Sequence, residues 1–125
     1  MPDSAGGNTD KTTIGLTARA REIADHLQEA EGISELLEIA VIGMGIGISL
    51  GLGRGSAKEV KTIWNVGTFD GSGKYRDLFR ALYDDLDTPY RQMEYVINEG
   101  LEKLAEEYTE APSSLTLSRV LGKFT

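Results

Sequence analysis

One uncharged stretch constrains this chain more than any other feature of its sequence. Residues 39–53 read IAVIGMGIGISLGLG and contain no Asp, Glu, Lys or Arg. These fifteen residues fall short of the roughly 20 that a helix needs to cross a bilayer. We therefore expect the stretch to be buried in protein, with the rest of the chain arranged around it.

Glycine recurs through this stretch, although glycine lowers helix propensity by up to about 1 kcal/mol relative to alanine. Gly43, Gly47 and Gly51 follow one another at four-residue steps, so on a helix they form one smooth stripe. Such a stripe lets another helix approach closely. The pattern predicts a helix ending near Ser49 and assigns the three glycines to the centre of the domain or to an oligomer interface.

The N-terminal half is predicted to hold a short extended segment and two helices. Residues 12–16 favour a strand, and Thr17 is a suitable N-cap for a helix over residues 18–30, whose apolar positions recur at three- and four-residue steps. Gly32 suits the left-handed position that ends such a helix. Ser34 is then the expected cap of the glycine-rich helix.

Two more helices are predicted in the C-terminal half, after an extended or mixed segment over residues 60–69 and a turn at residues 70–73. The third helix has the most regular apolar spacing, at Tyr75, Leu78, Phe79, Leu82, Tyr83 and Leu86. Thr88 and Pro89 open the fourth, which extends to about residue 108. Its expected inward residues are Tyr90, Met93, Ile97, Leu101 and Leu104.

The predicted fold class is mainly α: a compact four-helix domain over residues 12–110, with a short N-terminal extended segment and little other strand. The order of its N-terminal half is like that of a ribbon-helix-helix protein. Residues 1–11 are expected to be a disordered terminus without a signal sequence, which predicts a cytoplasmic protein without a membrane partner. Residues 111–125 are expected to be a tail that can dock on the core or on a neighbouring subunit.

The net charge argues against nucleic-acid binding by the protein surface as a whole, because the chain carries 20 acidic and 13 basic side chains, a formal charge of -7. The charge is uneven, however. Residues 50–83 hold six basic and three acidic groups, a local sum of +3, whereas residues 84–110 sum to -7. The acidic region is either a solvated face or a docking surface for a basic partner.

The sequence contains no recognisable motif for catalysis or metal binding. The chain has no cysteine, which excludes a disulfide framework, a zinc-thiolate site and a thiol nucleophile. His26 stands alone on a predicted helix and is interpreted as a surface residue. The glycines match neither a P-loop nor a dinucleotide fingerprint. We therefore predict no catalytic residue, no metal and no cofactor, and thus a protein that is not an enzyme.

The middle of the chain holds the candidate binding site. Its cations flank a glycine-containing loop, whose backbone N–H groups and Ser56 hydroxyl could also reach phosphate oxygens. The candidate DNA-binding residues are Arg54, Ser56, Lys58, Lys61, Lys74, Arg76 and Arg80. Ordinary solvated side chains are the alternative reading. Two or four copies on one face of a homo-oligomer would multiply the phosphate contacts and favour DNA binding.

Several short motifs, read in order, carry a resemblance to a known family. They are Ile14-x-Leu16-Thr17-x-x-Ala20, Glu31-Gly32-Ile33, Ile48-Ser49-Leu50, Trp64 with Thr68-Phe69-x-Gly71, and Asn98-Glu99-Gly100-Leu101. Together they resemble DndE, a small protein of DNA phosphorothioation systems. The resemblance implies a homotetramer whose basic face binds duplex DNA, nicked DNA in particular, beside the enzymes that replace a phosphate oxygen with sulfur. The absence of cysteine fits a non-catalytic member.

Two other functions remain open at this point. A ribbon-helix-helix regulator would place paired strands from a dimer in the major groove, with Lys11, Thr12 and Thr13 as the candidates for reading bases. A pure assembly subunit would instead dock a basic modification enzyme on its acidic fourth helix without touching DNA. A homo-oligomer is predicted in addition, because the glycine-rich helix and the third helix offer more apolar surface than one small domain hides.

Overall fold

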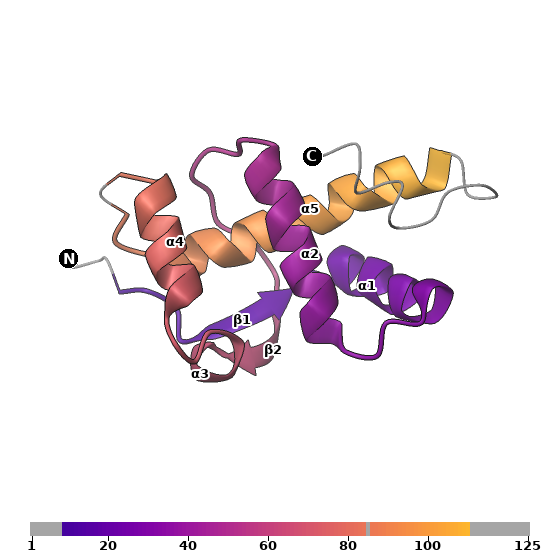
Figure 1. Cartoon of the computed structure of the whole chain (residues 1–125), viewed down its shortest axis with the longest axis horizontal. Coiled ribbons are helices and arrows are strands. Elements are labelled where there is room, and N and C mark those ends of the chain that lie inside the picture. The colour runs from indigo at the N-terminus through magenta and orange to yellow at the C-terminus, as the bar shows by residue number, and fades with distance from the viewer. Residues whose placement is uncertain (1–8, 85, 111–125) are drawn as a thin grey trace.

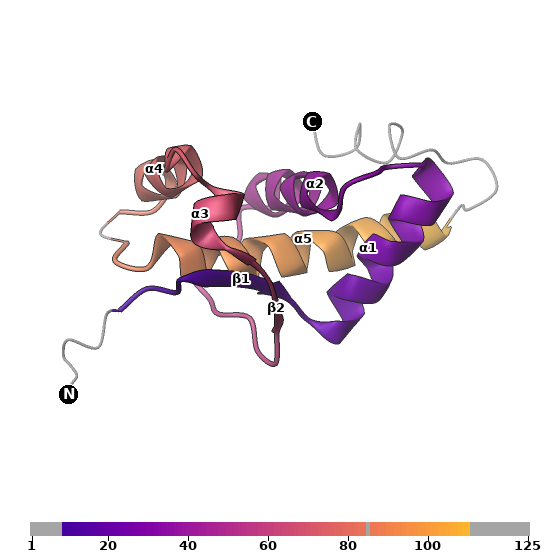
Figure 2. The ribbon, with the colours of Figure 1, turned by 90° about the horizontal axis from the view of Figure 1, so that it is seen from below.

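One long helix, α5 (Pro89–Glu110), runs through the middle of the computed structural model, which describes residues 9–84 and 86–110 (Figure 1). The other elements are β1 (Thr13–Leu16), α1 (Ala18–Glu31), α2 (Leu36–Ser49), β2 (Lys61–Asn65), α3 (Val66–Phe69) and α4 (Lys74–Leu82). Helices α2 and α4 lie on one side of α5, and the two strands lie on the other (Figure 2). The mainly α class is confirmed, with the one-turn α3 added to the four predicted helices.

The boundaries of α1 follow the predicted capping chemistry. The Thr17 side chain accepts a hydrogen bond from the Ala20 backbone N–H at 3.1 Å, which satisfies one of the free donors of the first turn. Gly32 ends the helix with φ 68°, in the left-handed region that favours glycine. For α2 the predicted cap is wrong. Its N-cap is Glu35 rather than Ser34, without a side-chain cap bond, although the helix does end at Ser49.

The two strands form a small antiparallel sheet in which β1 is covered on both edges. Ile14 pairs with Trp64 and Leu16 with Lys61 of β2, with an irregularity between Ile14 and Gly15. On the other side of β1, the Glu94 carboxylate of α5 accepts a bond from the Gly15 N–H at 2.9 Å. The predicted extended segment over residues 60–69 is therefore divided into β2 and the single turn of α3.

Helices α2 and α5 cross at backbone distance (Figure 1). The contact is formed by glycine on both helices. A Cβ on Gly100 would collide with the carbonyl oxygen of Gly43 and would lie 2.9 Å from the backbone nitrogen of Gly47. A Cβ on Gly47 would in turn collide with the carbonyl oxygen of Val96. The close approach expected of the glycine stripe therefore occurs within one chain, against α5.

This contact corrects the assignment of the stripe to an oligomer interface. Gly43 and Gly47 are buried against α5, so they have no surface left for a second subunit. Gly51 is not part of the stripe, because α2 ends before it. It has φ 68° and an open surrounding, with no atom within 4 Å of an added Cβ.

Helix α4 is shorter than predicted and only partly covered. It ends at Leu82, and Leu86, which the periodicity placed on the same helix, is buried beyond that end. Phe79 is fully buried, whereas Leu78 and Leu82 are 42% and 48% exposed. The apolar stripe of α4 therefore continues onto a face that the described part of the chain does not cover.

The interior of α5 agrees with the prediction. Met93, Ile97, Leu101 and Leu104 are each 0% exposed, and Tyr90 is half-buried. The N-terminal segment differs. Asp10, which was assigned to a disordered terminus, accepts hydrogen bonds from the backbone N–H groups of Tyr90 and Arg91 at 2.8 and 3.0 Å. Residues 1–8 and the predicted tail at residues 111–125 lie outside the described residues.

Within residues 9–84 and 86–110, no single helix is both long and apolar enough to cross a bilayer. Helices α1 and α2 have the necessary length and composition only as a pair, and that pair is bent by 112°.

Replacing Gly100 with alanine tests the α2–α5 contact. We expect Gly100→Ala to destabilise the protein by about 3 kcal/mol, because the methyl group forces the two backbones apart. Gly45→Ala is the matched control, since Gly45 lies on the exposed side of α2 with no atom within 4 Å, and it should stabilise the helix by up to about 1 kcal/mol. Chemical denaturation measures both. Equal free energies of unfolding for the two variants would contradict the described contact.

Candidate nucleic-acid interface

The seven predicted DNA-binding residues come from the loop of residues 50–60, from β2 and from α4. All are exposed except Arg76, which is half-buried. The structure does not gather them into one patch. They fall into two groups on opposite sides of α5, with the exposed Ser56 in the loop that connects the two sides.

The first group, here called the α4 cluster, consists of Arg54, Lys74, Arg76 and Arg80. Arg54 belongs to it because its guanidinium donates a hydrogen bond to the carbonyl oxygen of Asp84, just beyond the C-terminal end of α4. Arg80 lies in the last turn of α4, so Arg54 and Arg80 lie near the same end of that helix. Lys74 and Arg76 occupy the first turn of the same helix. The cluster therefore follows α4 along its length.

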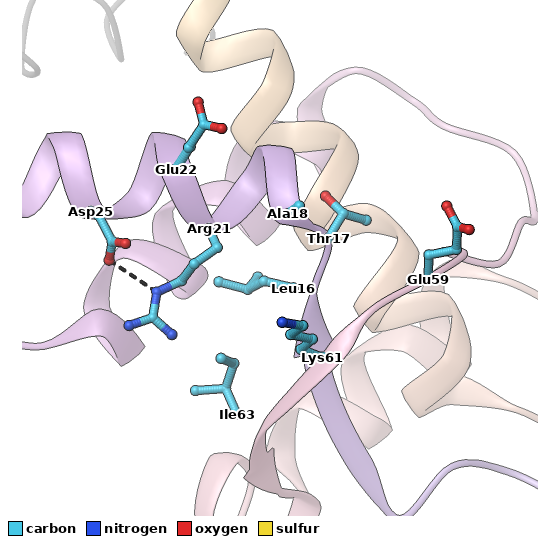
Figure 3. Close-up of a pocket in the computed structure, with 9 residues that line it drawn as sticks. All are labelled: Leu16, Thr17, Ala18, Arg21, Glu22, Asp25, Glu59, Lys61 and Ile63. Carbon is cyan, nitrogen blue, oxygen red and sulfur yellow. Dashed lines mark hydrogen bonds and ion pairs between the residues drawn. The ribbon is translucent and has the colours of Figure 1, made fainter.

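The second group, here called the β2 cluster, consists of Lys58 and Lys61. The loop after α2 crosses α5 to reach the strands, on the side away from α4 (Figure 2). Lys61 borders a pocket of about 290 Å³ between β2 and the start of α1, together with Glu22, Asp25 and Glu59 (Figure 3). These carboxylates reduce the positive potential around the β2 cluster, although Arg21 lines the same pocket and pairs with Asp25. The exposed Asp77, Asp84 and Asp87 act in the same way on the α4 cluster.

The loop of residues 50–60 is anchored by hydrogen bonds to side chains of neighbouring elements. The buried Gln92 side chain accepts from the Gly55 N–H and donates to the Gly53 carbonyl, both at 2.9 Å. The Tyr83 hydroxyl donates to the Leu52 carbonyl at 2.9 Å. The N–H of Gly55 is therefore already used and cannot bind a phosphate oxygen.

A buried carboxylate orients α4. Asp70 is 5% exposed, and its two oxygens accept hydrogen bonds from the backbone N–H groups of Tyr75 and Arg76, each at 3.0 Å. It thereby satisfies the first turn of α4 and places a negative charge at the positive end of that helix. The Tyr90 hydroxyl of α5 donates to the same carboxylate at 3.0 Å. Asp70 thus joins α4 to α5.

Burial, together with the hydrogen bond to Asp70, raises the pKa of the Tyr90 phenol above its ordinary value of 10.0. Both effects favour the protonated phenol, because ionisation would leave a phenolate beside a carboxylate in a partly desolvated site. Tyr90 therefore remains a hydrogen-bond donor throughout the neutral pH range.

The cations of the α4 cluster differ in how they are held. The Arg76 Nε lies 3.2 Å from a carboxylate oxygen of Asp77, and the Lys74 ammonium lies 5.2 Å from the ring centre of Tyr75. Among the described residues Arg80 forms no ion pair, and the same is true of Lys58 and Lys61. Arg80 is therefore the cation of this cluster most available for a phosphate.

Apolar and basic residues occupy different sides of α4. Leu78 and Leu82 are four residues apart and form one row, while Arg76 and Arg80 form another. At 100° per residue, the two rows point in nearly opposite directions around the helix. An apolar contact and a phosphate contact at Arg76 and Arg80 can therefore use α4 at the same time, whereas Lys74 lies four residues before Leu78 and belongs to the apolar side.

The contacts of β1 do not favour the ribbon-helix-helix interpretation. The Lys11 ammonium, a candidate for reading bases, lies 2.8 Å from both carboxylate oxygens of Glu94, which is 1% exposed. Asn98 accepts from the Thr17 N–H and donates to the Gly15 carbonyl. With β2 on one edge and α5 on the other, β1 has no free edge for a strand from a second subunit.

The residues that position this surface were missed by the sequence analysis. Gln92, Glu94 and Asn98 are each at most 2% exposed, yet all are polar. The sequence did indicate their burial, because they stand next to the inward apolar positions Met93 and Ile97 on the same helix. Buried polar side chains need partners, and here each partner is a segment of backbone or a charged side chain.

Metal binding has no support among the described residues, where no group of three or more His, Asp or Glu side chains could hold an ion. His26 lies on the exposed face of α1, as expected. The carboxylates of Asp84 and Asp87 are exposed between α4 and α5.

No family model matches the chain, and neither the curated proteins nor the solved structures contain a significantly similar protein.

The Tyr90–Asp70 bond can be tested through the pH dependence of stability. Because the phenol is protonated in the folded state at a pKa above 10.0, its stabilisation should be complete below pH 10 and be lost as pH rises through the raised pKa. We expect Tyr90→Phe to remove this alkaline dependence and to cost about 1 kcal/mol at neutral pH. Denaturation at a series of pH values measures both, with Tyr95→Phe as control. An unchanged alkaline profile in Tyr90→Phe would refute the assignment.

Proposed function

We propose that this protein is a non-catalytic DNA-binding component of a DNA phosphorothioation system and that it binds duplex or nicked DNA through the α4 cluster. The resemblance of its ordered motifs to DndE supports the pathway. The observation that carries the DNA contact is the position of Lys74, Arg76 and Arg80 on α4, with the Arg54 guanidinium bonded just beyond the C-terminal end of that helix. No cofactor takes part in this proposal.

Electrostatics determines how DNA would approach. The chain carries -7 overall, so most of its surface repels a phosphate backbone. The α4 cluster lies at the end of the molecule away from α1, which has an acidic outer face with Glu22, Asp25 and Glu29 (Figure 1). Asp77, Asp84 and Asp87 are also exposed at the α4 end, so the attraction proposed there is local to the cations themselves. The contacts would be to phosphates and thus independent of base sequence.

Stacking of bases on aromatic side chains is not part of the mechanism. Phe69 is 4% exposed and meets the half-buried Trp64 edge to face, with ring centres 5.3 Å apart. Both rings pack against the core. Affinity must instead come from the number of phosphate contacts, which is small in one copy.

A homo-oligomer would multiply those contacts, as the family resemblance implies for a tetramer. The row of Leu78 and Leu82 is the surface that favours association, because it is apolar, exposed and separate from the arginine row of α4. The same row favours a second candidate function. In this second candidate function, the protein is an assembly subunit that does not touch DNA. It docks another phosphorothioation protein through α4 or through the acidic surface of α5.

Duplex binding across a salt series is the decisive test, with nicked and intact DNA compared. We expect Lys74→Glu with Arg80→Glu to abolish or strongly weaken binding, and to reduce the slope of log K against log salt by about 0.9 for each phosphate that the variant no longer neutralises. Lys58→Glu with Lys61→Glu is the matched control, because it makes the same change in net charge on the β2 cluster.

The outcomes separate the hypotheses. If only the β2 variant loses binding, DNA binds on the side of the sheet and the α4 assignment is wrong. If neither variant changes binding, or if the wild-type chain binds no DNA at low salt, the assembly-subunit function is favoured.

The oligomer is tested separately. We expect light scattering to show a multimer at micromolar concentration in high salt, where electrostatic contacts are screened. Leu78→Ser with Leu82→Ser should shift it to smaller species without unfolding, because both side chains are largely exposed. A wild-type monomer under these conditions would remove the prediction.

A further inference from the structure

Strand β2 has a free edge. Among the described residues the sheet has two strands, and β1 lies between β2 and α5. In Figure 1, β2 lies on the outer side of β1, and no labelled element lies beyond it. All five residues of β2 are at least partly exposed. An exposed edge strand is a template to which another extended segment can add.

The backbone of β2 presents hydrogen-bonding groups at this edge. The N–H of Val66, just after the strand, donates to the Thr12 carbonyl at 2.9 Å. Thr13 and Asn65 are the adjacent pair in the register. Because bonded and non-bonded pairs alternate in an antiparallel ladder, the Asn65 N–H is turned away from β1 and toward the free edge. The strand contains no proline, so each of its residues has an N–H donor.

The pocket between β2 and α1 lies beside this edge, on one face of the sheet. Lys61 and Ile63 are two residues apart and both border the pocket, so they share that face. Leu16 of β1, which is buried, borders it as well. In Figure 3 the side chains of these three residues converge. The pocket therefore offers an apolar surface with the ammonium group of Lys61 next to it.

Charge in the pocket favours an acidic group beside Lys61. Lys61 is the only charged residue of β2, and among the described residues it forms no ion pair. Arg21 and Asp25 of α1 pair with each other at 2.9 Å. The other two carboxylates of the pocket, those of Glu22 and Glu59, are directed away from its centre in Figure 3. A carboxylate placed directly next to Lys61 would therefore supply the counter-charge that this ammonium lacks.

We propose that an extended segment of a partner protein adds to the free edge of β2 as a third, antiparallel strand, with an apolar residue opposite Ile63 and an acidic residue opposite Lys61. Directly opposite side chains of an antiparallel pair lie about 5 Å apart, so both pairs are in contact. In the partner the apolar residue precedes the acidic one by two positions. Main-chain hydrogen bonds supply affinity, and the two side chains supply selectivity.

This surface is separate from the proposed DNA contact. Strand β2 and helix α4 lie on opposite sides of α5 (Figure 2). A peptide on β2 therefore leaves Arg76 and Arg80 of α4 accessible. The inference does not rest on DNA binding, and its tests contain no DNA.

A synthetic peptide tests the site directly. The probe is short, acetylated and amidated, and carries a valine two positions before a glutamate in a background of threonine. It is titrated into the full-length protein enriched in nitrogen-15. We expect the largest shifts of backbone amide signals at residues 61–65 and slower hydrogen exchange at Asn65. If millimolar peptide shifts none of these amides, the proposal is overturned.

N-methylation of the peptide distinguishes strand addition from other modes of binding. The N–H groups of a strand point alternately to its two sides, so only every second one can bond to β2. We expect N-methylation of that set to weaken binding by roughly tenfold or more, because bonds to β2 are lost, and N-methylation of the other set to leave it unchanged. Equal effects of the two sets would rule out a third strand.

Charge exchange tests the register. We expect Lys61→Glu to weaken binding of the glutamate peptide severalfold and to strengthen binding of the same peptide with lysine in place of glutamate, because like charges directly opposite each other repel. Lys58→Glu is the matched control, since it makes the same change in net charge at an exposed residue outside the strand. Equal effects of the two substitutions would show that no acidic residue lies opposite Lys61.

A second copy of this chain is the competing occupant of the edge. Pairing of β2 with β2 of another copy would make the amide signals of residues 61–65 depend on protein concentration without any peptide. We expect these signals to be independent of concentration. A dependence confined to them would show a contact between copies and would overturn the proposal of a partner peptide.

Discussion

The rest of the structure depends on the crossing of α2 and α5, where Gly100 meets Gly43 and Gly47 at backbone distance. Because glycine has no side chain at these three positions, the two helices approach more closely than they could with any larger residue there. The crossing brings the uncharged stretch of the chain against the long helix α5. The lower helix propensity of glycine is offset by the tight packing of Ile97, Leu101 and Val96 around the contact.

Beside this contact, α5 carries a series of polar side chains, and each holds a different segment of the chain. Tyr90 binds Asp70 before α4, Gln92 binds the loop of residues 50–60, and Glu94 binds Lys11 and β1. These groups are buried or half-buried, so an unmatched partner would cost free energy. The positions of α4 and of the loop, and hence of Arg54 relative to Arg80, therefore follow from α5.

Local patterns in the sequence were sufficient to predict most of the helices. Thr17, Gly32 and Pro89 mark helix ends through capping and backbone geometry, which depend on a few neighbouring residues. The predicted cap at Ser34 was wrong because α2 begins at Leu36, so Glu35 is its N-cap, without a side-chain cap bond. The length of α4 was wrong because Leu86 is buried by tertiary contacts after the helix has ended. Apolar spacing indicates burial, and burial does not require one continuous helix.

By itself, the sequence determined the helical class, the buried stretch and the uneven distribution of charge, because each of these follows from residue type and spacing along the chain. Only the tertiary structure decided that the glycines face α5 and that the seven candidate residues divide between the α4 and β2 clusters. The reason is physical. Residues that are close in the sequence are separated in space where a loop crosses α5. In addition, the partners of buried groups such as Glu94 and Gln92 lie up to 83 residues away along the chain.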